Sequence, residues 1–318
     1  MGLIANILSP FTNRRSGDRA CVQFSPTIVH IVTIRQNSEG RPQLTLCIRL
    51  KNATTSSATI ADIVNKYKLR NTPTTMVLNQ HDYQLFLMDA PNTPKDEWQD
   101  AMQWQIQEHI TEPASEMVVD LFDIPASKTG AEPNRIYVAA AKKSTIEKWS
   151  HLSLNSGLKL DNITIPELSL VPLAAQLPEQ SKGLGLLQLD RKGGTLLIIK
   201  QNTLYIARTI INSISLSEEL TSFSAASQDE VALEVRRTMD FFAGTFDQPT
   251  INALYLLPSS QPLPGLQTAL SSRLELVVKE FDIKKFIDIP TDLPKNDLID
   301  ALPAIGAALL NNKASAGG

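Results

Sequence analysis

The sequence predicts an α/β protein built of two lobes, each of which opens with a β-meander and closes with helices. Short apolar runs separated by compact turns occur twice, from Arg19 onward and again from Leu184 onward. Segments with helical periodicity follow each set of runs. A chain of 318 residues is long enough for one large or two medium cores, and the restart at residues 181–183 favours two lobes.

The composition describes an ordinary globular protein. Apolar residues make up 42% of the chain, charged residues make up 20%, and the formal net charge is -3. The chain lacks the basic excess of a nucleic-acid-binding protein, so no nucleic acid is expected among its partners. Cys21 and Cys47 lie in apolar runs, which predicts buried, reduced thiols and an intracellular location and gives no sign of a disulfide framework.

The N-terminal segment, residues 1–18, has an amphipathic pattern that leaves two interpretations open. Its apolar residues fall on one helical face ahead of Arg14 and Arg15, as in a short helix that lies on an anionic membrane or docks in a partner. A frayed or core-packed terminus is the favoured interpretation. The arginines follow the apolar residues, unlike in a signal peptide, and no apolar run approaches the length of a membrane span. The apolar face consists of Leu3, Ile4, Ile7, Leu8 and Phe11.

The first lobe is predicted to span residues 19–180 and to begin with a meander of three strands. Ser25, Pro26 and Thr27 form the turn between the first two strands. A short helix with an inward apolar face should follow the meander, and two further strands should follow the helix. The predicted ranges are 19–34 for the first two strands, 43–50 for the third, 58–67 for the helix, and 75–78 and 83–88 for the last strands.

A subdomain of about residues 90–150 is predicted to be inserted in this lobe. Thr93, Pro94 and Asp96 indicate a helix start, with an N-cap, a proline at the first helical position and an acid at the third. The helix should run to about residue 109 with one apolar stripe at i, i+4 spacing. That stripe comprises Trp98, Met102, Ile106 and Ile110. Strands over 116–124 and 135–141, a helix over 144–154 and a strand over 158–165 complete the lobe.

The second lobe is predicted to span residues 181–311, followed by a flexible tail over 312–318. Consecutive hairpins fill residues 184–208. Ser227 and Glu230 match a capping box at the start of a long helix. A buried strand over 251–257, a helix from 265, a short strand over 274–278 and a closing helix over 303–310 should follow.

Motifs for common catalytic chemistries are absent from the sequence. The four histidines stand far apart, without metal-ligand spacing, and neither a nucleophile elbow nor a Walker loop occurs. The hairpin from Asp190 through Gly193 and Gly194 to Thr195 is the exception. Its backbone N–H groups can cradle a phosphate and its carboxylate can hold a metal-bound water, although a plain meander explains the same residues.

Several segments, taken in order, resemble the PilM family of type IV pilus assembly proteins, in particular its members from mannose-sensitive haemagglutinin (MSHA) pili. The resemblance covers about residues 19–310. It implies the actin-like, FtsA-like fold, in which a nucleotide lies in the cleft between two lobes. The matching segments are residues 90–110, 119–125, 137–142, 156–160, 163–168, 235–242 and 263–266.

The first phosphate hairpin of nucleotide-binding members corresponds here to residues 21–30. Gln23 stands where the family has the Asp that orients metal-bound water, and Ser25 replaces the glycine that lets backbone approach phosphate. Pro26 removes an N–H donor, and His30 stands at the lysine position. The resemblance therefore implies that this hairpin no longer binds phosphate.

The second and third nucleotide turns of the family are also altered. The second turn keeps Asp190 and Thr195, but Lys192 replaces its glycine, and Gly193 and Gly194 are displaced. The third, adenosine-contacting turn is usually Gly-Gly, and here its sequence is Pro-Ser-Ser over residues 258–260. ATP hydrolysis is therefore not expected and no cofactor is required. Weak binding of Mg·ATP at the second turn remains an alternative.

The resemblance implies a non-catalytic cytoplasmic scaffold of a pilus assembly machine, held at the inner membrane by the cytoplasmic tail of a PilN-like partner. By position, residues 88–110 and 118–125 should form the wall of the groove that takes this tail. A working ATPase of the same fold is one alternative. The cytoplasmic domain of a type II secretion linker protein is another, disfavoured because no membrane segment follows. The expected contacts are Trp98, Met102, Ile106, Asp120 and Phe122.

Overall fold

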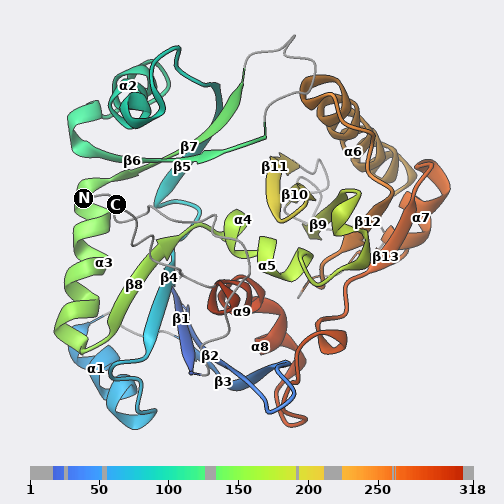
Figure 1. The fold of residues 1–318 in the computed structure, drawn as a ribbon. Coiled ribbons are helices and arrows are strands. Elements are labelled where there is room, and N and C mark those ends of the chain that lie inside the picture. Colours follow the sequence, from blue (N-terminus) through green and yellow to red (C-terminus); the bar gives the residue numbers. More distant parts are fainter. Residues whose placement is uncertain are drawn as a thin grey trace.

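A computed structural model describes residues 17–24, 28–51, 56–125, 134–190, 193–210, 224–259, 261 and 263–310. Its strands form two five-stranded sheets and one three-stranded sheet, called here the first, second and third sheets (Figure 1). The predictions for residues 1–16, for the 25–27 turn and for the tail lie outside the described residues.

The first sheet has the strand order β3-β2-β1-β4-β8. β1 pairs antiparallel with β2 and parallel with β4, so the opening meander continues into a βαβ arrangement. The apolar runs predicted as strands are strands, and most of β2 is buried because both faces of the sheet are covered. The elements are β1 (Arg19–Phe24), β2 (Ile28–Gln36), β3 (Pro42–Lys51), α1 (Ser57–Lys66), β4 (Pro73–Val77) and β8 (Lys159–Thr164).

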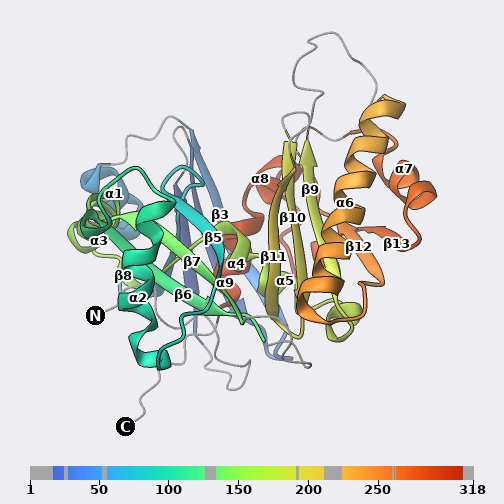
Figure 2. The same cartoon turned by 90° about the horizontal axis from the view of Figure 1, so that it is seen from above.

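The second sheet repeats this plan with the order β11-β10-β9-β12-β13. Two antiparallel pairs again lead into two parallel ones, so the predicted restart of the chain is confirmed. α6 and α7 lie on the outer side of this sheet, as Figures 1 and 2 show. The elements are β9 (Leu184–Asp190), β10 (Gly193–Lys200), β11 (Thr203–Ile210), α6 (Ala225–Phe246), β12 (Ala253–Leu256), α7 (Leu266–Arg273) and β13 (Val277–Glu280).

The third sheet belongs to the inserted subdomain and has the order β5-β7-β6, with both pairs antiparallel. The subdomain therefore covers about residues 83–142, not 90–150, because the strand at 83 pairs into it and the helix after 142 packs on the first lobe. Its elements are β5 (Tyr83–Asp89), η1 (Lys95–Glu97), α2 (Trp98–Gln105), η2 (Ile106–Glu108), η3 (Ala114–Glu116), β6 (Met117–Asp123) and β7 (Arg135–Lys142), with α3 (Lys143–Ser156) after them.

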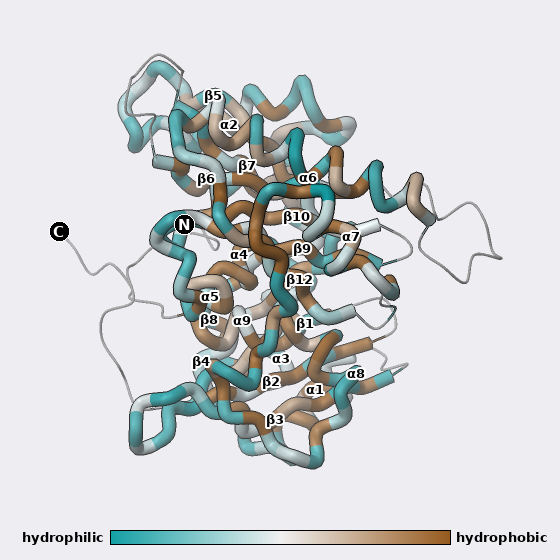
Figure 3. The backbone as a smooth tube through the Cα atoms, turned by 90° about the vertical axis from the view of Figure 1, so that its right-hand side faces the viewer, coloured by the Kyte–Doolittle hydropathy of each residue, from teal (hydrophilic) through white to brown (hydrophobic). Residues whose placement is uncertain are grey.

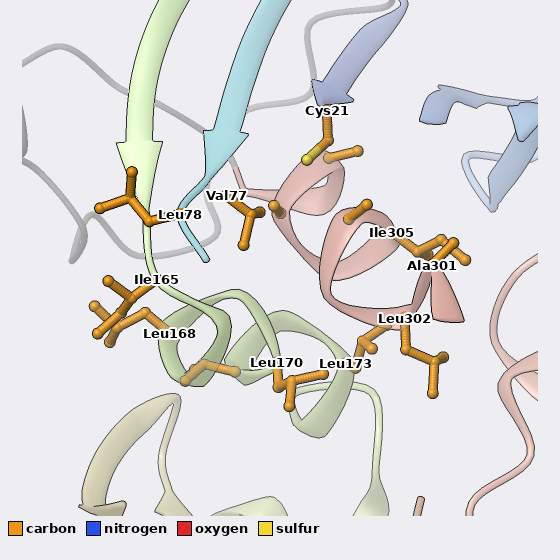
Figure 4. Packing of buried hydrophobic residues seen from close by; sticks show 14 of the residues in the cluster. Cys21, Val77, Leu78, Ile165, Leu168, Leu170, Leu173, Ala301, Leu302 and Ile305 are labelled. Atoms are coloured by element: carbon orange, nitrogen blue, oxygen red, sulfur yellow. The ribbon is translucent and has the colours of Figure 1, made fainter. Parts of the chain in front are cut away.

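Short helices join the lobes, and the last helix of the chain crosses back to the first lobe. α9 packs on β1, β2 and β4, so the predicted boundary that gave residues 181–311 to the second lobe is wrong for this helix. Figure 4 shows Leu170 and Leu173 beside Leu302 at this junction. The elements are α4 (Pro166–Ser169), α5 (Val171–Ala174), η4 (Pro178–Ser181), η6 (Ile283–Lys285), α8 (Lys295–Asp300) and α9 (Leu302–Leu309).

Three apolar clusters hold these layers together. The largest runs from the first sheet through the junction helices into the inner face of the second sheet. A second lies between the second sheet and α6 and α7, and a third lies between the third sheet and α2. In Figure 3 the strands are mainly hydrophobic, whereas α6 alternates hydrophilic and hydrophobic turns, as a helix on a sheet surface should.

Two predicted helix starts shift in the structure. α6 begins at Ala225 and is capped by Ser224, three residues before the predicted Ser227, because the Ser224 hydroxyl accepts from the Ser227 N–H (3.1 Å). The helix expected over 93–109 is broken into η1, α2 and η2, and Pro94 precedes it without a side-chain cap.

Both cysteines are free thiols; Cys21 is buried as predicted, whereas Cys47 is only partly buried. Of the helices in the described ranges, none combines the length and the apolar character needed to cross a bilayer.

Candidate functional site

A pocket of about 690 Å³ opens between the lobes, and the hairpin singled out in the sequence forms one of its walls. Asp190, Gly193, Gly194 and Thr195 all line it, so the structure brings these four predicted residues together. Lys192 lies outside the described residues. The opposite wall comes from the turn after β4, from β5 and from α4.

Strand packing accounts for the two glycines of this hairpin. Gly193 pairs with Asp190 across the turn and has a φ of 122°, a backbone conformation that glycine adopts without strain. A Cβ on Gly194 would lie 1.9 Å from the carbonyl oxygen of Gln188 on β9. The hairpin itself needs both glycines, so their presence does not by itself indicate a phosphate ligand.

Glu167 of α4 adds a partly buried carboxyl group to the pocket. It accepts a hydrogen bond from the Tyr83 hydroxyl of β5 (2.5 Å). Burial raises the pKa of Glu167, and the same burial together with the neighbouring carboxylate raises the pKa of Tyr83. This hydrogen bond joins the third sheet to the junction helices. In the sequence, the only sign of it is a single acidic residue that follows a proline.

The first hairpin carries an amide and an imidazole at its Gln23 and His30 positions. Gln23, His30 and Arg49 lie in register across β1, β2 and β3 and therefore share a face of the first sheet. His30 is only 3% exposed, and burial is the main cause that lowers its pKa, which favours the neutral imidazole. Neither imidazole nitrogen contacts a hydrogen-bond partner among the described residues. An amide and a neutral imidazole thus stand where the resemblance expects a carboxylate and an ammonium group.

The segment that corresponds to the family's third, adenosine-contacting turn lies at a second pocket, which has a volume of about 400 Å³. Pro258 and Ser259 line it beside apolar residues at the carboxyl ends of the parallel strands β9, β12 and β13. Side chains from the turn therefore face the space that a Gly-Gly turn would leave open.

Three of the predicted partner contacts are core residues. Met102 and Ile106 have no exposed surface and pack with β6 and β7 in the third cluster. Phe122 is 6% exposed and its ring stacks on Tyr137 at 4.8 Å between centroids. The prediction that these side chains line an open groove is therefore corrected, because Met102 and Ile106 cover one face of the third sheet and Phe122 packs in the largest cluster on the other face.

Trp98 and Asp120 keep some exposure and remain candidates. The Trp98 indole N–H donates to the Thr93 carbonyl (3.0 Å), and Lys95 lies over the ring. Asp120 accepts from the Leu121 N–H (2.9 Å), and burial raises its pKa to about 6. Both residues are held in place and partly available to a ligand.

Trp104 is 76% exposed, the most open of the large apolar side chains described. It lies on α2 but off the buried stripe, and this position was the only sign in the sequence that it faces outward.

Tyr137 joins the inserted subdomain to the second lobe, and sequence reasoning missed it. Its hydroxyl accepts a hydrogen bond from the Ala207 N–H of β11 (2.7 Å). Tyr137, Phe122 and Asp120 share one face of the third sheet, called here its inner face, which is turned toward the lobes. A tyrosine in an apolar strand carries no distinguishing pattern, so nothing in the sequence marked this contact.

Within the described part of the chain, no group of three or more His, Cys, Asp or Glu side chains is placed to hold a metal ion.

Comparison with known proteins gives structural similarity without sequence matches. No protein-family model matches the chain, and no curated protein sequence matches it. Among solved structures, one described as the PilM-PilN type IV pilus biogenesis complex is similar over 92% of this chain and 96% of that chain. The TM-score is 0.61 and the sequence identity 17%.

A second similar structure is the cytoplasmic domain of EpsL, an inner membrane component of the type II secretion system of Vibrio cholerae. It covers 93% of this chain and 99% of that chain, with a TM-score of 0.50 and 11% identity. The strand orders of the first and second sheets and these similarities establish a two-lobed α/β fold of the actin-like type.

Proposed function

We propose that this protein is a non-catalytic scaffold of a type IV pilus assembly machine that binds the cytoplasmic tail of a PilN-like inner-membrane protein. The observation that carries the proposal is the inserted subdomain of residues 83–142. It interrupts an otherwise repeated two-lobe plan and is anchored to both lobes, through Tyr83 to Glu167 and through Tyr137 to Ala207. Similarity to the solved structure described as the PilM-PilN type IV pilus biogenesis complex supports the same role.

The finer assignment is to the MSHA type of pilus, with the chain acting as an MshI-like protein. It would be cytoplasmic and peripheral at the inner membrane, held there by its partner. Two of the segments that suggested this assignment, residues 119–125 and 137–142, fall mainly on the strands β6 and β7, which build the inner face. An extended tail would pair with the main chain of the edge strand β6 and reach the partly exposed Asp120 on this face.

Asp120 is the residue we expect to contact the tail. Its carboxyl group is partly buried on the inner face, and a partner that donates a hydrogen bond to the ionised form would lower its raised pKa. Asp123 on the same strand is the matched control, because its carboxylate pairs with Lys95 on the other side of the sheet.

The test is a calorimetric titration of the full chain with a synthetic peptide of the cytoplasmic tail of the PilN-like protein from the same pilus operon. Saturable binding is expected, with about a tenfold loss in Asp120→Asn and no loss in Asp123→Asn. Absence of binding to the tail of any membrane protein of the operon would reject the proposal.

A working ATPase is the second candidate, favoured by Asp190 and Glu167 in the wall of one interlobe pocket. We propose against it, because Gln23 and His30 replace the charged groups of the first hairpin. The scaffold proposal expects no rise in melting temperature with millimolar Mg·ATP, since a ligand that binds the native state must raise it. A clear rise that Asp190→Ala abolishes would establish a nucleotide site.

The cytoplasmic domain of a secretion linker is the third candidate, favoured by the similarity to the EpsL domain. If the chain is such a secretion domain, it should have no affinity for a pilus tail peptide. The same titration therefore separates it from the scaffold proposal.

A further inference from the structure

The second sheet has an edge that the inserted subdomain covers only in part. β11 is the edge strand of the second sheet next to β10, so the N–H and carbonyl groups of every second residue point away from β10. Ala207 shows the direction, because its N–H donates outward to the Tyr137 hydroxyl. Thr209 lies two residues further along the strand, so its N–H and carbonyl point the same way.

This part of the edge faces the interlobe pocket. Ala207, Thr209 and Ile210 line one side of the pocket, and Tyr83 and Leu85 of β5 line the other. Among the residues that the structure describes, none forms a hydrogen bond with the outward N–H of Thr209. The pocket thus presents the outward N–H and carbonyl of Thr209, together with the outward carbonyl of Ala207, to a molecule that enters it.

We propose that this edge binds an extended peptide segment of a second protein, which adds to β11 as a further strand. Main-chain hydrogen bonds to Thr209 supply affinity, and alternate side chains of the peptide meet Tyr83 and Leu85. Glu167 lies in the same pocket, so a peptide side chain that ends in an amide or ammonium group is matched there.

The arrangement of the groups selects a peptide over a nucleotide. Phosphate is held by several N–H groups that converge on one point, whereas a strand edge offers N–H and carbonyl groups alternately along a line. Glu167 and Asp190 add carboxylates to the pocket, which repel a phosphate unless a cation such as Mg²⁺ lies between them. The inference does not depend on the pilus partner, and its test uses no pilus protein, so the two proposals can fail separately.

The test uses a fluorescein-labelled peptide amide, Val-Lys-Val-Thr-Val, and the full chain. Saturable binding is expected in fluorescence anisotropy, and the same peptide N-methylated at alternate residues should bind at least about tenfold more weakly, because it cannot pair with a strand. Absence of binding at millimolar protein, or equal binding of the N-methylated peptide, overturns the inference. The comparison of the two peptides uses the natural protein, so it tests the inference even if a variant protein fails to fold.

Two variants of Thr209 locate the binding at β11. Thr209→Pro removes the outward N–H without removing a hydrogen bond to β10, because proline is tolerated on the outer side of an edge strand. Its affinity for the peptide should fall at least about tenfold, while Thr209→Val, which keeps the N–H and the branched side chain, should bind as the natural protein does. Unchanged binding in Thr209→Pro overturns the inference.

Two other occupants are distinguished in the same experiments. Displacement of the peptide by Mg·ATP, if Asp190→Ala prevents it, would make the pocket a nucleotide site and overturn the inference. If the chain self-associates in sedimentation experiments and Thr209→Pro abolishes this association, the occupant of the edge is a second copy of the chain. That result also overturns the inference.

Discussion

The first and second sheets have the same strand order and the same mixture of antiparallel and parallel pairs, yet the two lobes differ in what joins their fourth and fifth strands. In the second lobe, only a short segment that contains α7 joins β12 to β13. In the first lobe, the whole third sheet, α2 and α3 stand between β4 and β8. The repeated parts build the cores of the two lobes, and the unrepeated part supplies the face proposed here for the pilus tail.

The lobes also differ at their opening hairpins. The second lobe keeps Asp190 and two glycines, and strand packing explains Gly194. The first lobe has Gln23 and a buried, neutral His30 at the corresponding place. A turn can therefore need its glycines for the fold alone, while the corresponding hairpin of the other lobe carries an amide and an imidazole.

The largest expected effect tests whether a closely packed junction holds the two lobes together. A Cβ on Gly306 of α9 would lie 1.9 Å from the Ser169 carbonyl oxygen of α4. We expect Gly306→Ala to lower the free energy of unfolding by about 3 kcal/mol in urea denaturation. Gly244→Ala on the outer helix α6 is the control, since its Cβ meets open space and should raise the free energy of unfolding by about 0.5–1 kcal/mol. Equal effects of the two changes would contradict the packing described.

The next effect concerns the titration of Asp120 on the unrepeated third sheet. Its pKa is raised from 3.8 to about 6 by burial, so the native state binds more protons than the unfolded state between these values. The free energy of unfolding should therefore fall as the pH rises through this window. Asp120→Asn has no carboxyl group at this position, so its free energy of unfolding should not fall in this pH window. The variant should therefore be more stable than the natural protein by about 2 kcal/mol at pH 7, with little difference at pH 4.

Urea denaturation of both proteins at several pH values measures this difference. Asp123→Asn removes a carboxylate from the same strand and controls for the change of net charge. A constant difference between Asp120→Asn and the natural protein from pH 4 to 7 would contradict the raised pKa.

The smallest effect tests the bond that fixes the third sheet to the second lobe. Tyr137→Phe removes the acceptor of the Ala207 N–H, and we expect it to cost about 1–2 kcal/mol of stability. The Ala207 amide should then exchange with solvent deuterium at least about tenfold faster. Unchanged exchange at Ala207 would show that the two regions are joined by other contacts.

Apolar periodicity predicted most of the strands and the restart of the plan, because burial on a sheet or under a helix leaves a regular pattern. The same pattern could not tell which surface a helix covers. The stripe with Met102 and Ile106 is compatible with the wall of a partner groove, yet it covers the third sheet of the same subdomain. The four described hairpin residues predicted to gather at one site do so, since they are neighbours in the chain.

Contacts between distant segments left no local signal. Tyr83 with Glu167, and Tyr137 with Ala207, depend on where the third sheet is placed, which no window of sequence encodes. The return of α9 to the first lobe is of the same kind, because its apolar pattern is compatible with burial against either sheet.

The place of α9 has a consequence for synthesis of the chain. Residues 302–309 cover the inner side of β1, β2 and β4, which are made first. On the ribosome, the first lobe must therefore wait with an uncovered apolar surface until residues 302–309 have emerged. A chaperone that shields this surface, or an early collapse of the second lobe beside it, would bridge that interval. A nascent chain that stops before residue 302 should stay sensitive to protease in both its beginning and its end.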